Sequence, residues 1–201
     1  MKVLRFLVPR ISPADLGRMV VVTIAGAFVA GAYGILHDQV TYSISPEYFS
    51  RFKFQQFAYA EPPGGHPRVF AGIIGFLATW WVGAFFAWAM ARVALMRNEG
   101  LPPYREFAVA FLITFSISFL IACGGFGYGL WRKARSYAVG WTEWMDAMAV
   151  QDTESFMTVG YIHNSSYLGG VVGTLVAILY LRAARKRQNL GPVLADSAES
   201  S

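Results

Sequence analysis

Two histidines far apart in the sequence are the side chains best suited to chemistry. His37 is followed by Asp38 and Gln39 at the end of a long apolar segment, and His163 is followed by Asn164 within another. Transition metals accept imidazole nitrogens and carboxylate oxygens, so His37, Asp38 and His163 are candidate metal ligands. A bis-histidine haem is a further alternative. The spacing offers no HxxH or HxxxH pair on one helical face, so it does not by itself indicate a metal site.

A simpler interpretation is that these polar groups cap helix ends and hold connections in place by hydrogen bonds. Polar side chains near an apolar boundary need partners, and Tyr33, Tyr161 and Tyr167 could supply them. Consecutive residues in a helix point about 100° apart, so His37 and Asp38 are not expected to face the same ion. We expect hydrogen bonding at this cluster, with no cofactor favoured, and keep a metal or haem site as the alternative.

The composition indicates the environment of these residues. The chain has 201 residues, of which 55% are hydrophobic and only 14% charged, whereas soluble domains average about 25% charged residues. This deficit indicates a membrane protein, and the net charge of +5 then reflects membrane topology rather than nucleic-acid binding. The single cysteine, Cys123, excludes an intrachain disulfide, and we expect it to be buried.

Four segments are long and apolar enough to cross a bilayer, which takes about 20 residues in a helix. They predict an all-α integral membrane protein with four transmembrane helices in a bundle. We expect one domain over residues 1–190 and a disordered cytoplasmic tail over 191–201. The predicted spans are about 17–37, 69–95, 107–130 and 158–182.

A cleaved signal peptide is the rival interpretation of the first span. The segment follows basic residues, and Ala30-Gly31-Ala32 resembles a cleavage site. Against cleavage, the apolar run continues to Leu36 and the preceding region contains Asp15. We therefore expect the span to be retained, and the orientation of the other three spans is the same in either case.

The long connections over residues 38–67 and 131–157 are unusually rich in aromatic residues. In the first, alternating residues from Val40 to Ser45 predict a short strand. Ser45-Pro46-Glu47 then predicts a helix start, because a capping hydroxyl, a proline and a carboxylate each suit the first turn. In the second, Trp141 to Val150 predicts a short helix.

We expect the two connections to form a partly helical cap outside the cytoplasm. Its rings could pack on one another, or they could form a surface for lipid or for another membrane or extracytoplasmic protein. These rings are Tyr48, Phe49, Phe52, Phe54, Trp141 and Trp144.

The distribution of positive charge predicts the topology. Eleven of the 17 Lys and Arg residues fall in the N-terminal segment, the short middle turn and the C-terminal flank. By the positive-inside rule both termini are cytoplasmic, in the cell or inner membrane. If the helices pack in chain order, the first and fourth are neighbours, and His37 and His163 meet at the outer boundary. Small residues that allow close helix association are Gly26, Ala30, Gly34, Gly169 and Gly173.

Three functions remain open from the sequence. We favour a non-catalytic accessory, assembly or interaction subunit that presents its aromatic cap to a partner. The alternative is a membrane-bound metal- or haem-dependent oxidoreductase, or another enzyme, that uses the His/Asp cluster. The third is a transporter or channel component for an uncharged solute, which is weakened because the span interiors lack the charged residues typical of ion paths.

Overall fold

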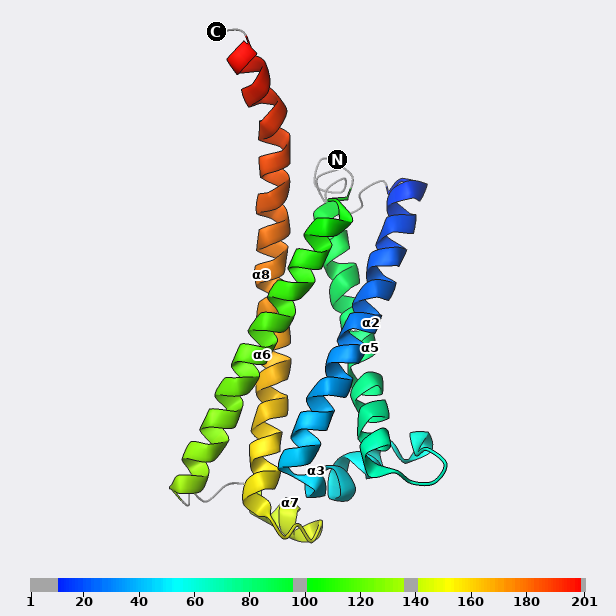
Figure 1. Cartoon of the computed structure of the whole chain (residues 1–201), viewed down its shortest axis with the longest axis vertical. Helices are drawn as coiled ribbons and strands as arrows, with labels where there is room; N and C mark the ends of the chain where they lie inside the picture. Colours follow the sequence, from blue (N-terminus) through cyan, green and yellow to red (C-terminus); the bar gives the residue numbers. More distant parts are fainter. Residues whose placement is uncertain (1–10, 96–100, 136–140, 200–201) are drawn as a thin grey trace, which may run out of the picture.

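The computed structural model describes residues 11–95, 101–135 and 141–199, with side chains described as far as Arg187. These residues form four long helices and several short ones, without a strand among them (Figure 1). The long helices are α2 (Pro13–Ile44), α5 (Pro67–Ala94), α6 (Tyr104–Ala134) and α8 (Thr153–Glu199). The short segments are α3 (Pro46–Tyr48), a π-helical turn (Phe49–Lys53), α4 (Phe54–Gln56), a 3₁₀ turn (Ala58–Ala60) and α7 (Thr142–Ala147).

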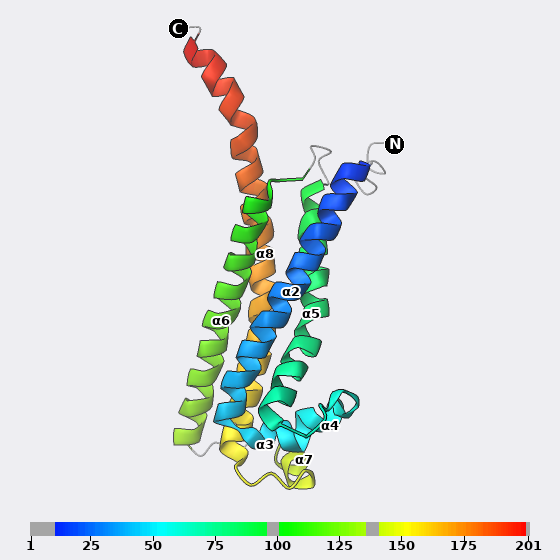
Figure 2. The same ribbon diagram turned by 45° about the vertical axis from the view of Figure 1, so that its right-hand side comes forward.

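The four long helices confirm the all-α fold with four helices of transmembrane length and composition. Each contains a stretch that is long and apolar enough to cross a membrane. α2 begins after Ser12, whose hydroxyl accepts a hydrogen bond from the Asp15 amide at 3.1 Å. The beginning of α2 and the end of α8 lie at one end of the bundle, and α3, α4 and α7 lie at the other, which we call the connection end (Figures 1 and 2).

The bundle is built from two closely packed helix pairs rather than from a ring in chain order. In the first pair, α2 lies along α5, with small residues on both sides of the contact (Figure 2). A Cβ atom added to Gly34 would collide with the Gly75 carbonyl and the Thr79 hydroxyl, so the two backbones touch there. The Thr79 hydroxyl also donates to the Ala30 carbonyl at 2.8 Å. The small-residue ridge of α2 therefore packs inside the chain.

The second pair, α6 with α8, is held in the same way. Cβ atoms added to Gly169 and Gly173 would collide with the α6 backbone at Ser118 and Thr114. The Ser118 hydroxyl donates to the Ser166 carbonyl at 2.9 Å. The GxxxG sequence of α8 is thus used within the chain, by the close packing that such pairs allow.

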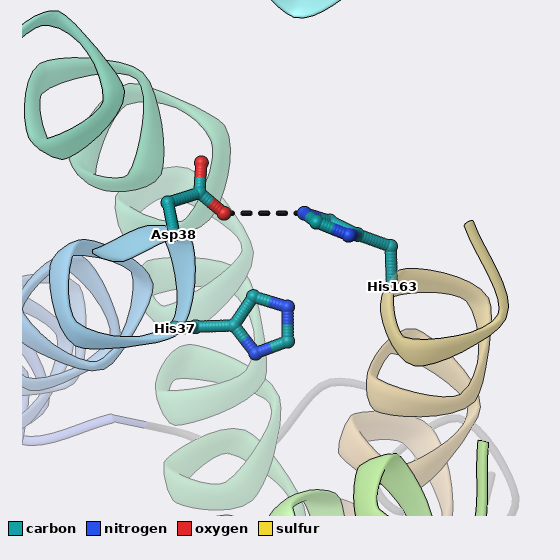
Figure 3. A group of neighbouring side chains, drawn as sticks. All are labelled: His37, Asp38 and His163. Carbon is teal, nitrogen blue, oxygen red and sulfur yellow. Dashed lines mark hydrogen bonds and ion pairs between the residues drawn. The ribbon is translucent and has the colours of Figure 1, made fainter. Parts of the chain in front are cut away.

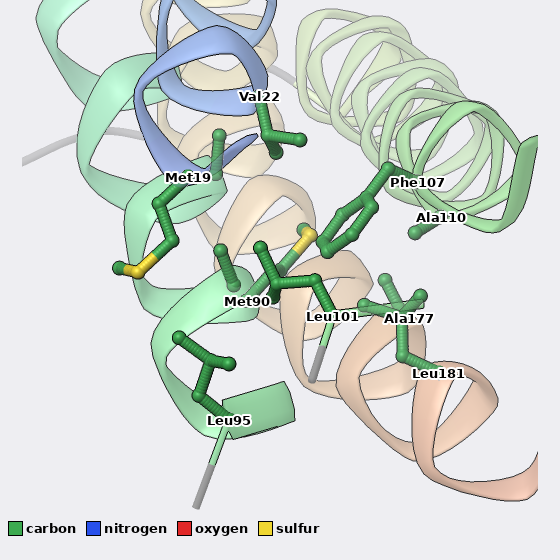
Figure 4. Close-up of a cluster of buried hydrophobic side chains, with 11 residues drawn as sticks. Met19, Val22, Met90, Leu95, Leu101, Phe107, Ala110, Ala177 and Leu181 are labelled. Atoms are coloured by element: carbon green, nitrogen blue, oxygen red, sulfur yellow. The ribbon is translucent and has the colours of Figure 1, made fainter. Parts of the chain in front are cut away.

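An apolar core joins the two pairs near the end of the bundle where α2 begins (Figure 4). Met90 of α5 and Phe107 of α6 are 1% and 2% exposed, and they meet Ala177 of α8 there. The Arg18 side chain of α2 donates a hydrogen bond to the Leu101 carbonyl, just before α6, at 3.0 Å. This core closes one end of the space between the pairs.

Several details differ from the sequence prediction. The strand predicted from Val40 to Ser45 is wrong, because α2 continues to Ile44 and ends only where Ser45, before a proline, adopts an extended conformation. Helix is favoured there because Asp38, Thr41 and Ser45, spaced by three and four residues, are all buried on one face. Cys123 was expected to be buried and is exposed on α6.

The predicted disordered tail overlaps the end of α8. The helix continues past residue 191 to Glu199, whereas the sequence analysis expected disorder there. The cytoplasmic location of this tail stays a prediction.

The two connections contain the predicted short helices. Ser45 caps α3 by accepting from the Tyr48 amide at 3.3 Å, and α7 lies inside the predicted segment. The Glu47 carboxylate accepts from the amides of Gln151 and Asp152 at 3.1 and 2.7 Å, so it links one connection to the other. Beneath them is a second apolar core, which includes the fully buried Phe49 and Phe156.

Candidate functional site

A buried cluster of charged and polar side chains lies where the first connection meets α2 and α8. The Lys53 ammonium lies 2.9 Å from Asp38 Oδ2, 3.2 Å from Asp38 Oδ1 and 2.9 Å from His163 Nε2. His163 Nε2 is also 3.1 Å from Asp38 Oδ1 (Figure 3). Asp38, Lys53 and His163 are only 2%, 5% and 2% exposed. Buried charges are costly unless paired, and here Lys53 and Asp38 compensate each other.

Local helix geometry directs Asp38 and Lys53 toward each other. Asp38 is buried because α2 remains helical to Ile44, which keeps its side chain on the inner face. Lys53 ends the π-helical turn, in which the Phe54 amide bonds to the Phe49 carbonyl five residues earlier. The wider turn changes the direction of Lys53, and π-helical turns of this kind are frequent at functional sites.

His163 is oriented by its own helix. Its Nδ1 lies 3.0 Å from the Val159 carbonyl, which can only accept, so Nδ1 carries the proton of that bond. Nε2 is therefore the nitrogen that faces Lys53 and Asp38. The ring of Tyr48 stacks on the imidazole with a centroid distance of 5.0 Å, which fixes the plane of the ring.

His37 completes the group; it projects from α2 beside Asp38 and points toward His163 of α8 (Figure 3). Its ring meets the His163 ring edge-to-face at a centroid distance of 4.7 Å, and it also contacts Tyr33. One ligand atom each from His37, Asp38 and His163 lie within 4.8 Å of one another. No hydrogen bond from the His37 ring occurs within the described part of the chain, so this imidazole is available to a ligand.

The five polar residues singled out from the sequence divide into two groups. His37, Asp38 and His163 come together, although two of them are neighbours in one helix. Gln39 lies elsewhere, where its amide donates to the Arg68 carbonyl at 2.8 Å. Asn164 is exposed beside a separate aromatic hollow.

Lys53 is the member of the cluster that the sequence analysis missed. It stands among Phe and Gln residues in a connection, where a lysine is usually solvent-exposed. The available signal was indirect: aromatic residues on both sides of Lys53 imply burial on both sides, and a buried lysine requires an acidic partner.

The aromatic residues proposed as a partner surface mostly pack inside the chain. Tyr48 and Phe49 are buried, and Phe52 and Trp144 meet edge-to-face at 5.0 Å. Trp144 keeps 42% of its surface exposed. Docking of a partner on these rings stays a prediction.

A cavity of about 390 Å³ lies between the two helix pairs and reaches the buried cluster. Its polar lining is concentrated around that cluster, and the rest of its lining is mainly apolar. The polar residues are Tyr33, His37, Asp38, Lys53, Thr79, Thr114, Ser118, His163, Ser166 and Tyr167. Of these, the Thr79 and Thr114 hydroxyls donate to carbonyls of their own helices. The apolar residues include Ala30, Trp81, Val82, Phe86, Ala87, Met90, Phe111, Phe115 and Val171.

The exposure of two lining residues indicates that the cavity opens at the surface of the bundle between α5 and α8. Trp81 of α5 and Val171 of α8 both line it, yet they are 57% and 47% exposed. At its far end the cavity stops at Ala87 and Met90, which belong to the first apolar core. A molecule entering from the side would therefore pass large apolar side chains before it reached the polar cluster.

Burial determines the electrostatics of the connection residues in the cluster. Removal from water lowers the pKa of the Lys53 ammonium, and the neighbouring Asp38 carboxylate opposes this shift. Burial also raises the pKa of the Tyr48 hydroxyl well above its usual value. Lys53 and Asp38 balance each other in charge, so the polar end of the cavity is close to neutral as a whole.

Together the fold and this site define a helical protein with four helices able to cross a membrane and a buried Asp–Lys–His cluster beside an internal cavity. No protein-family model, curated protein or solved structure matches the chain. The function must therefore be argued from the geometry alone.

Proposed function

We propose that this protein is a membrane-embedded binding protein for a small lipid-soluble molecule with a hydrogen-bonding head group. The observation that carries the proposal is the cavity between the helix pairs, whose lining is mainly apolar and whose charged side chains and histidines gather at one end. Ligand sites of this kind are concave and mostly apolar, with a few polar groups that fix orientation. The volume of about 390 Å³ lies within the usual range for such sites.

The opening between α5 and α8 supports a lipid-soluble ligand. If these helices cross a bilayer, the exposed rings of Trp81 and Phe85 face hydrocarbon, and the opening leads into lipid rather than water. A molecule dissolved in the membrane can then enter sideways. A strongly charged solute would pay a large desolvation penalty on that route.

The polar end favours a neutral head group. Lys53 and Asp38 already compensate each other, so a second charge would be left without a counter-ion. The free His37 imidazole and the Tyr33 hydroxyl can both donate and accept. A carbonyl or hydroxyl group on the ligand matches these partners.

The test measures binding of 4-octylphenol, which combines a hydroxyl head with an apolar body. Gly170 lines the cavity, and a Cβ added there would have only Phe86 near it, in ordinary contact at 3.7 Å, so Gly170→Leu directs its side chain into the cavity. Gly124 faces open space and supplies the matched control, Gly124→Leu. In lipid nanodiscs we expect saturable quenching of tryptophan fluorescence that is weakened at least tenfold in Gly170→Leu and unchanged in Gly124→Leu. Equal binding by both variants would overturn the proposal.

An interaction subunit remains the second candidate. It is favoured by Tyr59 and Trp144, which are 80% and 42% exposed at the connection end. We further propose that this end faces away from the cytoplasm, because the N-terminal segment, the short middle turn and the C-terminal flank hold eleven of the 17 Lys and Arg residues. Co-purification with one defined membrane partner, lost on Trp144→Ala, would support this role, and a monomer throughout would count against it.

A further inference from the structure

We propose that His37, Asp38 and His163 bind a divalent transition metal, and that Lys53 competes with the metal for the position between them. This inference goes beyond ligand binding in the cavity and does not depend on it. It stands on the spacing of the three ligand atoms, the orientation of His163 and the place of Lys53.

The ligand spacing is close to that of a metal site. Two ligands about 2.1 Å from one zinc ion in tetrahedral geometry are roughly 3.4 Å apart. His163 Nε2 and Asp38 Oδ1 are 3.1 Å apart, and all three ligand atoms lie within 4.8 Å of one another (Figure 3). Rotation of the His37 side chain has to bring its ring nitrogen closer to the other two ligand atoms by up to about 1.4 Å to complete the set.

His163 already has the arrangement typical of a metal-ligating histidine. Such a histidine donates its second ring N–H to a carbonyl or carboxylate, which fixes the ring and leaves the other nitrogen to the metal. Here Nδ1 bonds the Val159 carbonyl at 3.0 Å, and Nε2 points into the cluster. Tyr48 stacks against the ring, so His163 cannot easily turn away.

The donor set selects the class of ion. Two imidazole nitrogens and one carboxylate oxygen suit zinc, cobalt or iron, whereas magnesium and calcium prefer oxygen ligands throughout. Three protein ligands leave one position of a tetrahedral site open. His37, Asp38 and His163 all line the cavity, so the open position would face a molecule bound there.

The Lys53 ammonium occupies the position that the metal ion would take. Its ammonium is 2.9 Å from both Asp38 Oδ2 and His163 Nε2, so it compensates the carboxylate as a metal ion would. Both cations cannot occupy this position, because each needs the same lone pairs. Binding of a metal therefore requires Lys53 to move away, and removal of the ammonium favours the metal.

The first experiment titrates Co²⁺ into purified full-length protein. Lys53→Met should bind one Co²⁺ per chain, with the absorption bands of a four- or five-coordinate site, at least tenfold more tightly than the unsubstituted protein. Adding His163→Gln to Lys53→Met should abolish the spectrum. The matched control is Lys133→Met, since Lys133 forms an exposed ion pair with Glu154 and should leave Co²⁺ binding unchanged. Folded Lys53→Met without a saturable Co²⁺ spectrum would overturn the proposal.

A second experiment covers the case in which Lys53→Met does not fold. The unsubstituted protein is acetylated with and without Zn²⁺, and each lysine is quantified by mass spectrometry. Displacement by the metal should raise acetylation of the buried Lys53 at least severalfold and leave that of the exposed Lys133 unchanged. Unchanged acetylation of Lys53 at millimolar Zn²⁺ would contradict the competition.

Discussion

Removing one charge from the buried pair should destabilise the protein far more than removing both. In Lys53→Met the Asp38 carboxylate remains buried at 2% exposure without its cation, and in Asp38→Asn the ammonium loses its anion. Breaking a buried pair on one side costs about 3–5 kcal/mol. The double variant Asp38→Asn/Lys53→Met leaves no unpaired charge, so it should recover most of that loss. The two substitutions together should therefore lower the free energy of unfolding by less than the sum of their separate effects.

The assay is a double-mutant cycle on the free energy of unfolding, measured by circular dichroism in mixed micelles with increasing SDS. The matched control is the exposed pair Lys133–Glu154, whose side chains are 51% and 49% exposed at a separation of 3.3 Å. Lys133→Met should cost less than about 1 kcal/mol, because water and salt screen exposed pairs. Equal losses for Lys53→Met and Lys133→Met, or a double variant as unstable as the sum of the single ones, would refute the reasoning.

Three further predictions concern packing, capping and topology. Gly34→Leu should cost at least about 1–3 kcal/mol in unfolding free energy, because the new side chain would meet the Gly75 carbonyl, whereas Gly127→Leu, which faces open space, should cost almost nothing. Asp152→Ala should cost about 1 kcal/mol, since Asp152 caps α8 by accepting from the Ser155 amide at 3.0 Å. That bond lowers the pKa of the Asp152 carboxyl. The cap therefore stabilises the protein fully above the unfolded pKa of about 4, and this stabilisation is lost as the pH falls through the folded pKa. In a pH series of unfolding curves, the free energy of unfolding should fall less steeply with acid in Asp152→Asn. In a Cys123→Ser background, Tyr59→Cys should react in intact cells with a membrane-impermeant maleimide, and Lys186→Cys should react only after lysis; the reverse pattern would contradict the topology.

The four long apolar helices could be predicted because they depend on length and composition alone. A stretch of about 20 apolar residues is helical in a membrane, whatever it packs against. The start of α2 at Ser12 and the start of α3 at Ser45 also depend on local sequence. In both cases the serine hydroxyl accepts a hydrogen bond from the backbone amide three residues later. These features required no knowledge of the neighbouring helices.

The cluster could be predicted only in part, because its members are placed by tertiary packing. His37 and His163 were expected at similar depth from the lengths of their helices. The burial of Asp38 and the inward direction of Lys53 depend on α2 continuing to Ile44 and on the π-helical turn. The close pairing of α2 with α5 and of α6 with α8, which leaves the cavity between the pairs, is set by glycine contacts that span tens of residues.

The most direct test of the account is photolabelling in liposomes with a diazirine derivative of a fatty alcohol, followed by mapping of the labelled peptides. The cavity-lining rings of Phe86 and Phe111 should be labelled in a saturable way that 4-octylphenol competes away, and this labelling should disappear in Gly170→Leu. Labelling of the exposed outer residues Phe119 and Leu179 should rise linearly with probe and persist in that variant. If Phe86 and Phe111 remain unlabelled, or are labelled without saturation, the cavity does not bind a lipid-soluble molecule.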